Sequence, residues 1–182
     1  ISFFNMKDVA KHQKGVATAR AGNVIGGGDF SNDRIVPDIV RALQNDKTIE
    51  LRNPHAVRPW QHVLEPLGGY LILADKLYKH PHDFSQAFNF GPVPSDHLEV
   101  AQLADIAVKF WGHGNFISIG SSNQPHEANF LKLDINKAFR TLQWTPKLNA
   151  SQAIEWTMKW YKKDWRNALA FSFEQIENYM RL

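Results

Sequence analysis

The sequence predicts an α/β protein in which only part of a parallel sheet is present. Short segments rich in β-branched residues alternate with segments of helical periodicity, which is typical of α/β chains. Only residues 16–25 and 87–91 have the compact apolar composition of buried parallel strands. Two such strands do not make a doubly wound sheet, and the six tryptophans need cover. We therefore expect part of the sheet to lie outside this chain.

The first strand, residues 16–25 (VATARAGNVI), runs into three glycines at 26–28. A glycine-rich turn after a strand can cradle a phosphate, but the dinucleotide fingerprint G-x-G-x-x-G fails here in both registers. Ser31 and Val24 stand where the fingerprint needs glycine, and no Lys-Ser or Lys-Thr pair follows the run. The glycines therefore predict a tight turn that uses positive φ.

The next segment predicts a helix, a strand and a loop. Residues 31–33 (SND) offer N-cap candidates for the helix, and Pro37 fits its first turn. Residues 48–52 (TIELR) predict a strand, and the two prolines within residues 53–60 predict a loop. The helix carries its apolar side chains at helical spacing, at Ile35, Ile39, Val40 and Leu43.

Two longer helices flank the short strand 87–91 (AFNFG). The first, residues 65–80, opens at a Glu-Pro pair, and the second spans residues 99–112. Each shows one apolar stripe at helical offsets. The first stripe is Leu67, Tyr70, Leu71, Ala74, Leu77 and Tyr78; the second is Val100, Leu103, Ala104, Ala107, Phe110 and Trp111.

The rest of the chain predicts two strands and three helices. The strands are residues 116–120 (FISIG) and 130–134 (FLKLD), and Asp134 can cap a short helix that carries Ala138, Phe139 and Leu142. A final amphipathic segment lies near residues 173–179. The helix before it places its apolar residues on one face, at Ile154, Thr157, Met158, Tyr161 and Trp165.

Composition excludes several classes of protein. Hydrophobic residues make up 43% and charged residues 21%, close to the average for folded globular domains. No apolar run approaches the roughly 20 residues of a membrane span. Cysteine is absent, which excludes disulfides and thiolate metal sites and suits a reducing cytosol. The net charge of +3 arises from residues 1–20, and the remainder balances, so no nucleic-acid partner is expected.

Neither a metal site nor a catalytic nucleophile is predicted. The eight histidines show no H-x-x-x-H spacing, and no G-x-S-x-G turn is present. A better lead is residues 52–66 (RNPHAVRPWQHVLEP), where two arginines lie six residues apart in a proline-stiffened loop. The planar guanidinium suits bidentate binding of phosphate. The alternative is that Arg52 and Arg58 are solvated or pair with carboxylates.

Several segments together resemble extended short-chain dehydrogenase/reductases that act on nucleotide sugars, with the most specific likeness to CDP-glucose 4,6-dehydratases. The likeness covers nearly all of this chain and the C-terminal half of the family's enzymes. The segments are RAGNVIGGGD (20–29), DRIVPDIVRAL (33–43), RNPHAVRPWQHVLEPLGGYLILADKLY (52–78), FNFGP (88–92), PHEANFLKLD (125–134) and NKAFRTLQWTPKLNASQAIEWTMKWY (136–161).

The resemblance implies the C-terminal part of a Rossmann-like fold with its substrate-binding lobe, as one partial unit over residues 1–182. The last Rossmann strands would be residues 16–25 and 87–91, with helices 65–80 and 99–112. The lobe would be interleaved with them, over about residues 26–60 and 114–182.

The resemblance also implies roles for particular residues. Asn23 would contact the sugar or its phosphate, and Arg58 the pyrophosphate. Arg34 and Ile35 would lie near the nucleotide at the edge of the lobe, Leu51 and Arg52 beside the base and ribose. Glu127 and Asn129 would give further nucleotide contacts, although related enzymes often carry arginine where Asn129 stands.

The implied activity is that of an NAD-dependent lyase, which converts CDP-glucose to CDP-4-keto-6-deoxyglucose with loss of water. The family's catalytic Tyr-x-x-x-Lys is absent from this chain, so NAD and the catalytic groups are expected in an N-terminal half, and this chain alone is expected to be inactive. The implied setting is cytoplasmic deoxysugar biosynthesis, as for lipopolysaccharide O-antigen, in a homo-oligomer (dimer or tetramer). The alternatives are another nucleotide-sugar epimerase or dehydratase, or a non-catalytic nucleotide-sugar-binding module.

Overall fold

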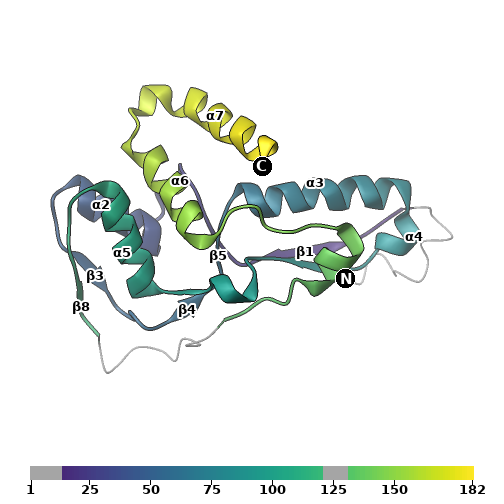
Figure 1. Cartoon of the computed structure of the whole chain (residues 1–182), viewed down its shortest axis with the longest axis horizontal. Coiled ribbons are helices and arrows are strands. Elements are labelled where there is room, and N and C mark those ends of the chain that lie inside the picture. Colours follow the sequence, from purple (N-terminus) through teal and green to yellow (C-terminus); the bar gives the residue numbers. More distant parts are fainter. Residues whose placement is uncertain (1–13, 121–130) are drawn as a thin grey trace.

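The computed structural model describes residues 14–120 and 131–182, which form an α/β structure of short strands and seven helical segments longer than three residues (Figure 1). The strands are β1 (Thr18–Ala21), β2 (Asn23–Ile25), β3 (Ile49–Leu51), β4 (Val57–Arg58), β5 (Trp60–His62), β6 (Ala87–Phe90), β7 (Leu98–Glu99) and β8 (Phe116–Ser118). The helical segments are α2 (Ile35–Gln44), α3 (Leu64–Lys79), α4 (Pro81–Phe84), α5 (Val100–Trp111), the π-helical turn η3 (Ala138–Leu142), α6 (Ala150–Lys162) and α7 (Ala168–Arg181).

The strands pair two by two, and three of the four pairs are parallel. β1 pairs with β6, β2 with β5, and β3 with β8, whereas β4 and β7 are antiparallel. Parallel pairs joined through helices agree with the α/β class predicted from the sequence. Among the described residues, no helix is both long enough and apolar enough to cross a bilayer.

The prediction of a single strand over residues 16–25 is wrong, because the chain changes partner at Gly22. The Gly22 amide donates to the Phe90 carbonyl of β6 at 3.2 Å, and the next amide, of Asn23, donates to the Pro59 carbonyl at 3.1 Å. A Cβ at position 22 would lie 2.7 Å from that Pro59 carbonyl oxygen. Only glycine lets the strand pass this close to the neighbouring backbone.

Two other predictions from sequence are also wrong. Residues 53–60, predicted as a loop, contain β4 and the start of β5, because Pro59 lies between the two strands and Pro54 lies three residues before β4. The described part of the predicted strand 130–134 has no strand partner. There, the Asp134 side chain accepts a hydrogen bond from the Asn136 amide at 2.8 Å, although the N-cap of η3 is Lys137, without a side-chain hydrogen bond.

Two apolar cores hold these elements together. The larger one lies between α2, α5 and α6 and buries Ile39, Leu103 and Ile154 completely. The smaller one lies where α3 covers the β1–β6 pair, around Phe90 and Trp144. The predicted apolar faces of α2, α5 and α6 are thus confirmed, except that Trp165 lies beyond α6 and is exposed. Residues 31–33 do not cap α2, whose N-cap is Arg34 without a side-chain hydrogen bond.

The predicted apolar stripe of α3 is not the side of the helix that this chain buries. The helix forms, but it buries Gly69 and Leu73, while Leu67, Leu71 and Tyr78 lie exposed. The buried side is chosen by close approach: a Cβ on Gly69 would lie 2.3 Å from the Phe90 ring. A helix that is apolar on both sides is typical of a helix buried on both sides.

The two adjacent glycines of α3 give a matched test of this packing. Gly69→Ala must displace the Phe90 ring, and we expect it to lower the free energy of unfolding by about 1–3 kcal/mol. Gly68→Ala has ordinary contacts, because the nearest neighbour of its added Cβ, the Tyr179 hydroxyl oxygen, would lie 3.4 Å away. It should be neutral or stabilising by up to about 1 kcal/mol, since alanine favours a helix. Urea unfolding of both variants measures the difference; equal midpoints would contradict the assigned packing.

Candidate functional site

An open groove of about 1180 Å³ lies between the β1–β2 junction and the start of α2. The glycine turn forms one wall, and the ends of β3 and β4 form another. Its lining is mixed, with backbone, aliphatic and charged groups. The charged and amide side chains on it are Asn23, Asp29, Asp33, Arg34, Asp38, Glu50, Arg52, Asn53 and Arg58.

Three arginines face this groove, and each comes from a different element. Arg34 caps α2, Arg52 follows β3, and Arg58 ends β4. The Arg52 guanidinium pairs with the Asp33 carboxylate at 2.9 Å, and both side chains are mostly exposed, so the pair contributes little to stability. The Arg58 guanidinium donates to the Val57 carbonyl at 3.0 Å, which helps to fix the orientation of its planar fork. The pairing alternative raised from the sequence thus applies to Arg52.

The glycine run is a tight turn, as predicted, and α6 explains why it is glycine. A Cβ on Gly27 would lie 1.9 Å from the Trp160 ring, so the indole ring packs flat against the turn. Gly28 has a φ of 84°, a conformation that other residues rarely adopt. Next to it, the Tyr161 hydroxyl donates to the Asp29 carbonyl at 2.5 Å. Burial raises the pKa of Tyr161 to about 12, so this donor keeps its proton at neutral pH.

The Asp29 carboxylate stays ionised at the mouth of the groove. Its side chain accepts a hydrogen bond from the Ser31 amide at 3.0 Å, and this bond lowers the pKa of the carboxyl. Arg34 and Arg41 add smaller contributions in the same direction. The groove therefore carries charges of both signs, from the carboxylates and the guanidinium groups that line it.

Five of the residues assigned by resemblance line the groove: Asn23, Arg34, Ile35, Arg52 and Arg58. Leu51 does not, because its side chain is completely buried in the larger core. Its carbonyl accepts a hydrogen bond from the Ile119 amide at 3.0 Å. Glu127 and Asn129 lie outside the described residues.

The sequence analysis missed two parts of the site. Trp60 borders the groove with its side chain buried in the larger core, and its indole N–H has no partner in the described structure. Val100 reaches the groove from the start of α5, far along the chain. The position of Trp60, two residues after Arg58, could have indicated from sequence that it borders the groove. The position of Val100 depends on the β4–β7 pairing, which no local pattern predicts.

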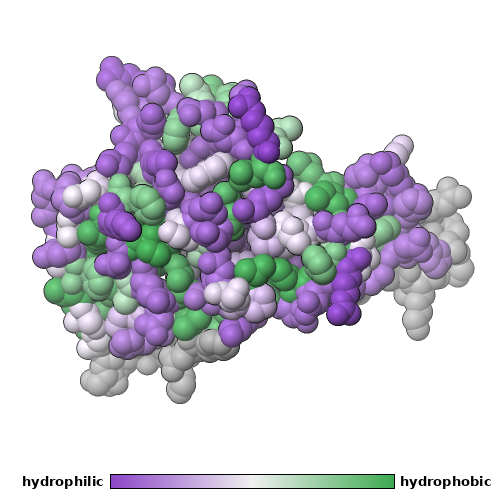
Figure 2. Space-filling view, in the orientation of Figure 1, coloured by the Kyte–Doolittle hydropathy of each residue, from purple (hydrophilic) through white to green (hydrophobic). Residues whose placement is uncertain are grey.

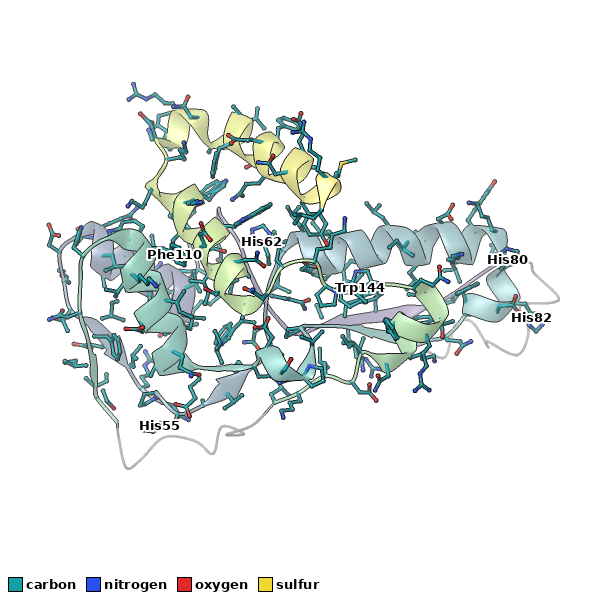
Figure 3. All side chains as sticks on the ribbon, viewed as in Figure 1. His55, His62, His80, His82, Phe110 and Trp144 are labelled. Atoms are coloured by element: carbon teal, nitrogen blue, oxygen red, sulfur yellow. The ribbon has the colours of Figure 1, made fainter. Side chains whose placement is uncertain are left out.

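Behind the glycine turn lies a buried histidine. The His62 ring packs edge-on against Trp156, with 5.7 Å between ring centroids, and Figure 3 shows it inside the molecule beside α6. Its Nε2 has no described partner, and burial lowers the pKa of His62 to about 4. The other labelled histidines, His55, His80 and His82, lie far from it at the periphery (Figure 3). Within the described ranges, no three His, Asp or Glu side chains cluster as metal ligands.

No protein-family model matches this chain. The chain is 42% identical to CDP-glucose 4,6-dehydratase of Salmonella typhimurium (strain LT2) over 181 residues, which are 98% of this chain and 50% of the relative. The likeness predicted from the sequence is therefore confirmed, and the chain spans about half the length of this relative, corresponding to its C-terminal half.

Solved structures confirm the fold. A dTDP-glucose 4,6-dehydratase from Bacillus anthracis in complex with NAD gives a TM-score of 0.66 at 16% identity, over 91% of this chain and 50% of that one. A UDP-glucuronic acid 4-epimerase from Bacillus cereus, in complex with UDP-glucuronic acid and NAD, gives 0.69 at 17% identity, over 85% and 47%. The chain thus has the C-terminal part of the Rossmann-like extended fold of these enzymes.

The packing of Trp160 on the glycine turn can be tested directly. Gly27→Ala places a methyl group inside the indole ring, and we expect a loss of about 1–3 kcal/mol in the free energy of unfolding. Loss of near-ultraviolet circular dichroism should accompany it as the ring moves. The control is Gly91→Ala, whose added Cβ meets its nearest neighbour at an ordinary 3.5 Å. If Gly27→Ala left both stability and the tryptophan spectrum unchanged, the turn would not be packed as described.

His62 gives the protein a predicted loss of stability in acid. Its folded pKa, about 4, lies below the ordinary 6.5, so between these values the unfolded state binds a proton that the folded state does not. The free energy of unfolding should therefore fall as pH drops from 6.5 to 4, by about 3 kcal/mol from this residue. His62→Phe should flatten the profile, and the exposed control His113→Phe should not. An unchanged slope in His62→Phe would show that His62 titrates normally.

Proposed function

We propose that this chain is the substrate-binding half of a nucleotide-sugar 4,6-dehydratase that acts on CDP-glucose. One observation carries the proposal: three arginines from separate elements meet at a single open groove, in a chain 42% identical to CDP-glucose 4,6-dehydratase. A sugar nucleotide has a diphosphate with two negative charges between two polar ends. A groove of about 1180 Å³ is large enough for such a ligand.

The arginines supply the main attraction for the diphosphate. Arg58 sits on a strand that β7 holds in place, and the Val57 carbonyl orients its guanidinium, so the fork can bind phosphate with little loss of conformational freedom. Arg34, at the start of α2, would contact the same group or the nucleotide from the opposite side. Arg52 would exchange Asp33 for the ligand, because their exposed ion pair is weak.

The uncharged positions would select the two ends of the ligand. Asn23 offers a donor and an acceptor for the sugar hydroxyls or the sugar phosphate. Ile35 gives apolar surface suited to a base or a sugar face. Of the other assigned residues, Glu127 and Asn129 would complete the site, and Leu51 would contribute through its backbone.

NAD does not fit the residues described here. The glycine run lacks the spacing of the dinucleotide fingerprint, and the Trp160 ring packs against it at Gly27. We therefore assign NAD, together with the catalytic groups, to the N-terminal half of the complete enzyme. The present chain would bind, orient and enclose the substrate, and by itself it would not turn it over.

The same division explains the exposed apolar side of α3. β1 has one described neighbour, β6, and α3 covers this pair while turning Leu67, Leu71 and Tyr78 outward. Further strands beside β1 and a helix beside α3 would bury both features, which is the normal environment of a parallel sheet. The proposed setting is a soluble, homo-oligomeric enzyme of cytoplasmic deoxysugar biosynthesis.

One alternative has an observation in its favour: the enzyme would catalyse a related reaction or use another nucleotide. The fold is shared with a UDP-glucuronic acid 4-epimerase and a dTDP-glucose 4,6-dehydratase. Incubation of the complete gene product with CDP-, UDP- and dTDP-glucose decides between them. The proposal predicts a 4-keto-6-deoxy product from CDP-glucose. An epimerised sugar, or turnover of the UDP or dTDP sugar only, would favour the alternative. Binding without turnover would indicate a non-catalytic module.

The role of Arg58 is tested by calorimetry of CDP-glucose binding to the complete gene product. Arg58→Ala removes a charge-assisted contact to phosphate, so Kd should rise about tenfold or more. Arg140→Ala is the matched control, because Arg140 is exposed on η3 and does not line the groove. Both variants should keep the wild-type melting temperature without ligand. An unchanged Kd in Arg58→Ala would remove Arg58 from the site.

A further inference from the structure

The C-terminal helix α7 differs from an ordinary surface helix, because it buries polar side chains and exposes apolar ones. Its buried residues are polar: Gln175 donates to the Trp156 carbonyl at 2.9 Å, and the Tyr179 hydroxyl donates to the Glu65 carboxylate at 2.9 Å. Ser172, on the same side, accepts from the Trp160 indole N–H at 2.9 Å. Hydrogen bonds to polar side chains thus attach α7 to the body of the molecule.

Large apolar side chains cover the side of α7 next to the attached one and continue onto the turn before it. They recur every three or four residues and therefore form one stripe. We call this stripe the α7 stripe; its members, with their exposed fractions, are Trp165 (82%), Leu169 (71%), Phe173 (57%), Ile176 (39%) and Met180 (75%). A stripe of this kind normally faces a core, so its exposure indicates a missing partner surface.

The α7 stripe is separate from the sheet edge at β1. Gly69 of α3 faces Phe90 of β6, whereas its neighbour Gly68 faces Tyr179 of α7. The N-terminal part of α3 therefore lies between the β1–β6 pair and α7, and Figure 1 shows α7 as the outermost layer on that side. Hydrophobic surface is visible on both helices in Figure 2. Strands added beside β1 would extend the sheet layer and not the layer of α7.

We propose that the α7 stripe is a self-association surface that docks against the same stripe of a second copy, with the two helices antiparallel. The spacings from Leu169 to Phe173, Ile176 and Met180 are four, three and four residues, which read the same in both directions. An antiparallel pair then sets Leu169 opposite Met180 and Phe173 opposite Ile176. This is the self-complementary contact that two-fold symmetry requires.

The size of the surface fits such a contact. Aromatic side chains bury about 150–250 Å² each, so Trp165 and Phe173 present roughly 250 Å² at their exposed fractions. The three aliphatic members and Leu182, which is 62% exposed, bring the total to several hundred Å². A standard interface buries about 800 Å² per partner, so the stripe with its polar margins is of the right order.

Sedimentation velocity of the complete gene product tests the proposal. We expect a dimer or a larger even-numbered assembly, and Phe173→Glu should halve its mass at concentrations where the wild type is assembled, because it buries a charge at the centre of the contact. Ile117→Glu, at a similarly exposed residue of β8, is the control and should leave the mass unchanged. Circular dichroism checks that both variants fold. A wild-type monomer, or an unchanged mass in Phe173→Glu, overturns the proposal.

A cross-link makes the test independent of folding in a charged variant. The double variant Phe173→Cys, Ile176→Cys should form disulfides between two copies under mild oxidation, identified by mass spectrometry as 173–176 linkages between chains, since the proposed pairing sets these two positions opposite each other. Ile117→Cys should give no such dimer. If position 173 were instead linked to another segment of the same polypeptide, the α7 stripe would be an internal contact and the proposal would be wrong.

Discussion

The buried carboxylate of Glu65 is the interaction on which the arrangement of this chain depends. It accepts hydrogen bonds from the Lys147 amide at 3.0 Å, from the Leu148 amide at 2.7 Å and from the Tyr179 hydroxyl at 2.9 Å. One side chain therefore joins the start of α3, the segment that leads into α6, and the end of α7. Burial is the largest influence on the pKa of Glu65 and raises it, which is the cost of placing a carboxylate here. Its three donors would be left unpaired without it.

The groove is organised through the same helices. Fixing the segment at Leu148 fixes where α6 begins, and α6 in turn carries Trp160 and Tyr161 to the glycine turn. The turn forms one wall of the groove, so a contact at Glu65, away from the groove, helps to decide its shape. α7 enters this arrangement as well, because Ser172 holds the Trp160 indole N–H. Assembly through α7 and binding in the groove would thus share one structural support.

The sequence correctly predicted the elements whose apolar pattern is set by one buried surface. Helices α2 and α5 follow an apolar periodicity set by a single core, and strands β3 and β6 are short apolar runs between turns. Prediction from sequence failed where contacts between distant segments determine the structure. The strand break at Gly22 depends on the close approach of Pro59, and the buried side of α3 depends on its contact with Phe90. For the groove, the resemblance correctly predicted that Arg34, Arg52 and Arg58 lie together, whereas the lining by Trp60 and Val100 depends on strand pairing between distant segments.

Hydrogen–deuterium exchange of the complete gene product, with and without CDP-glucose, tests the central claim most directly. Binding in the groove predicts slower exchange of the amides in the glycine turn, at the start of α2 and in residues 52–58. The exposed end of α3, near Tyr78, should exchange at the same rate in both states. Protection confined to other parts of the polypeptide, with these segments unchanged, would contradict the assignment of the groove as the substrate site.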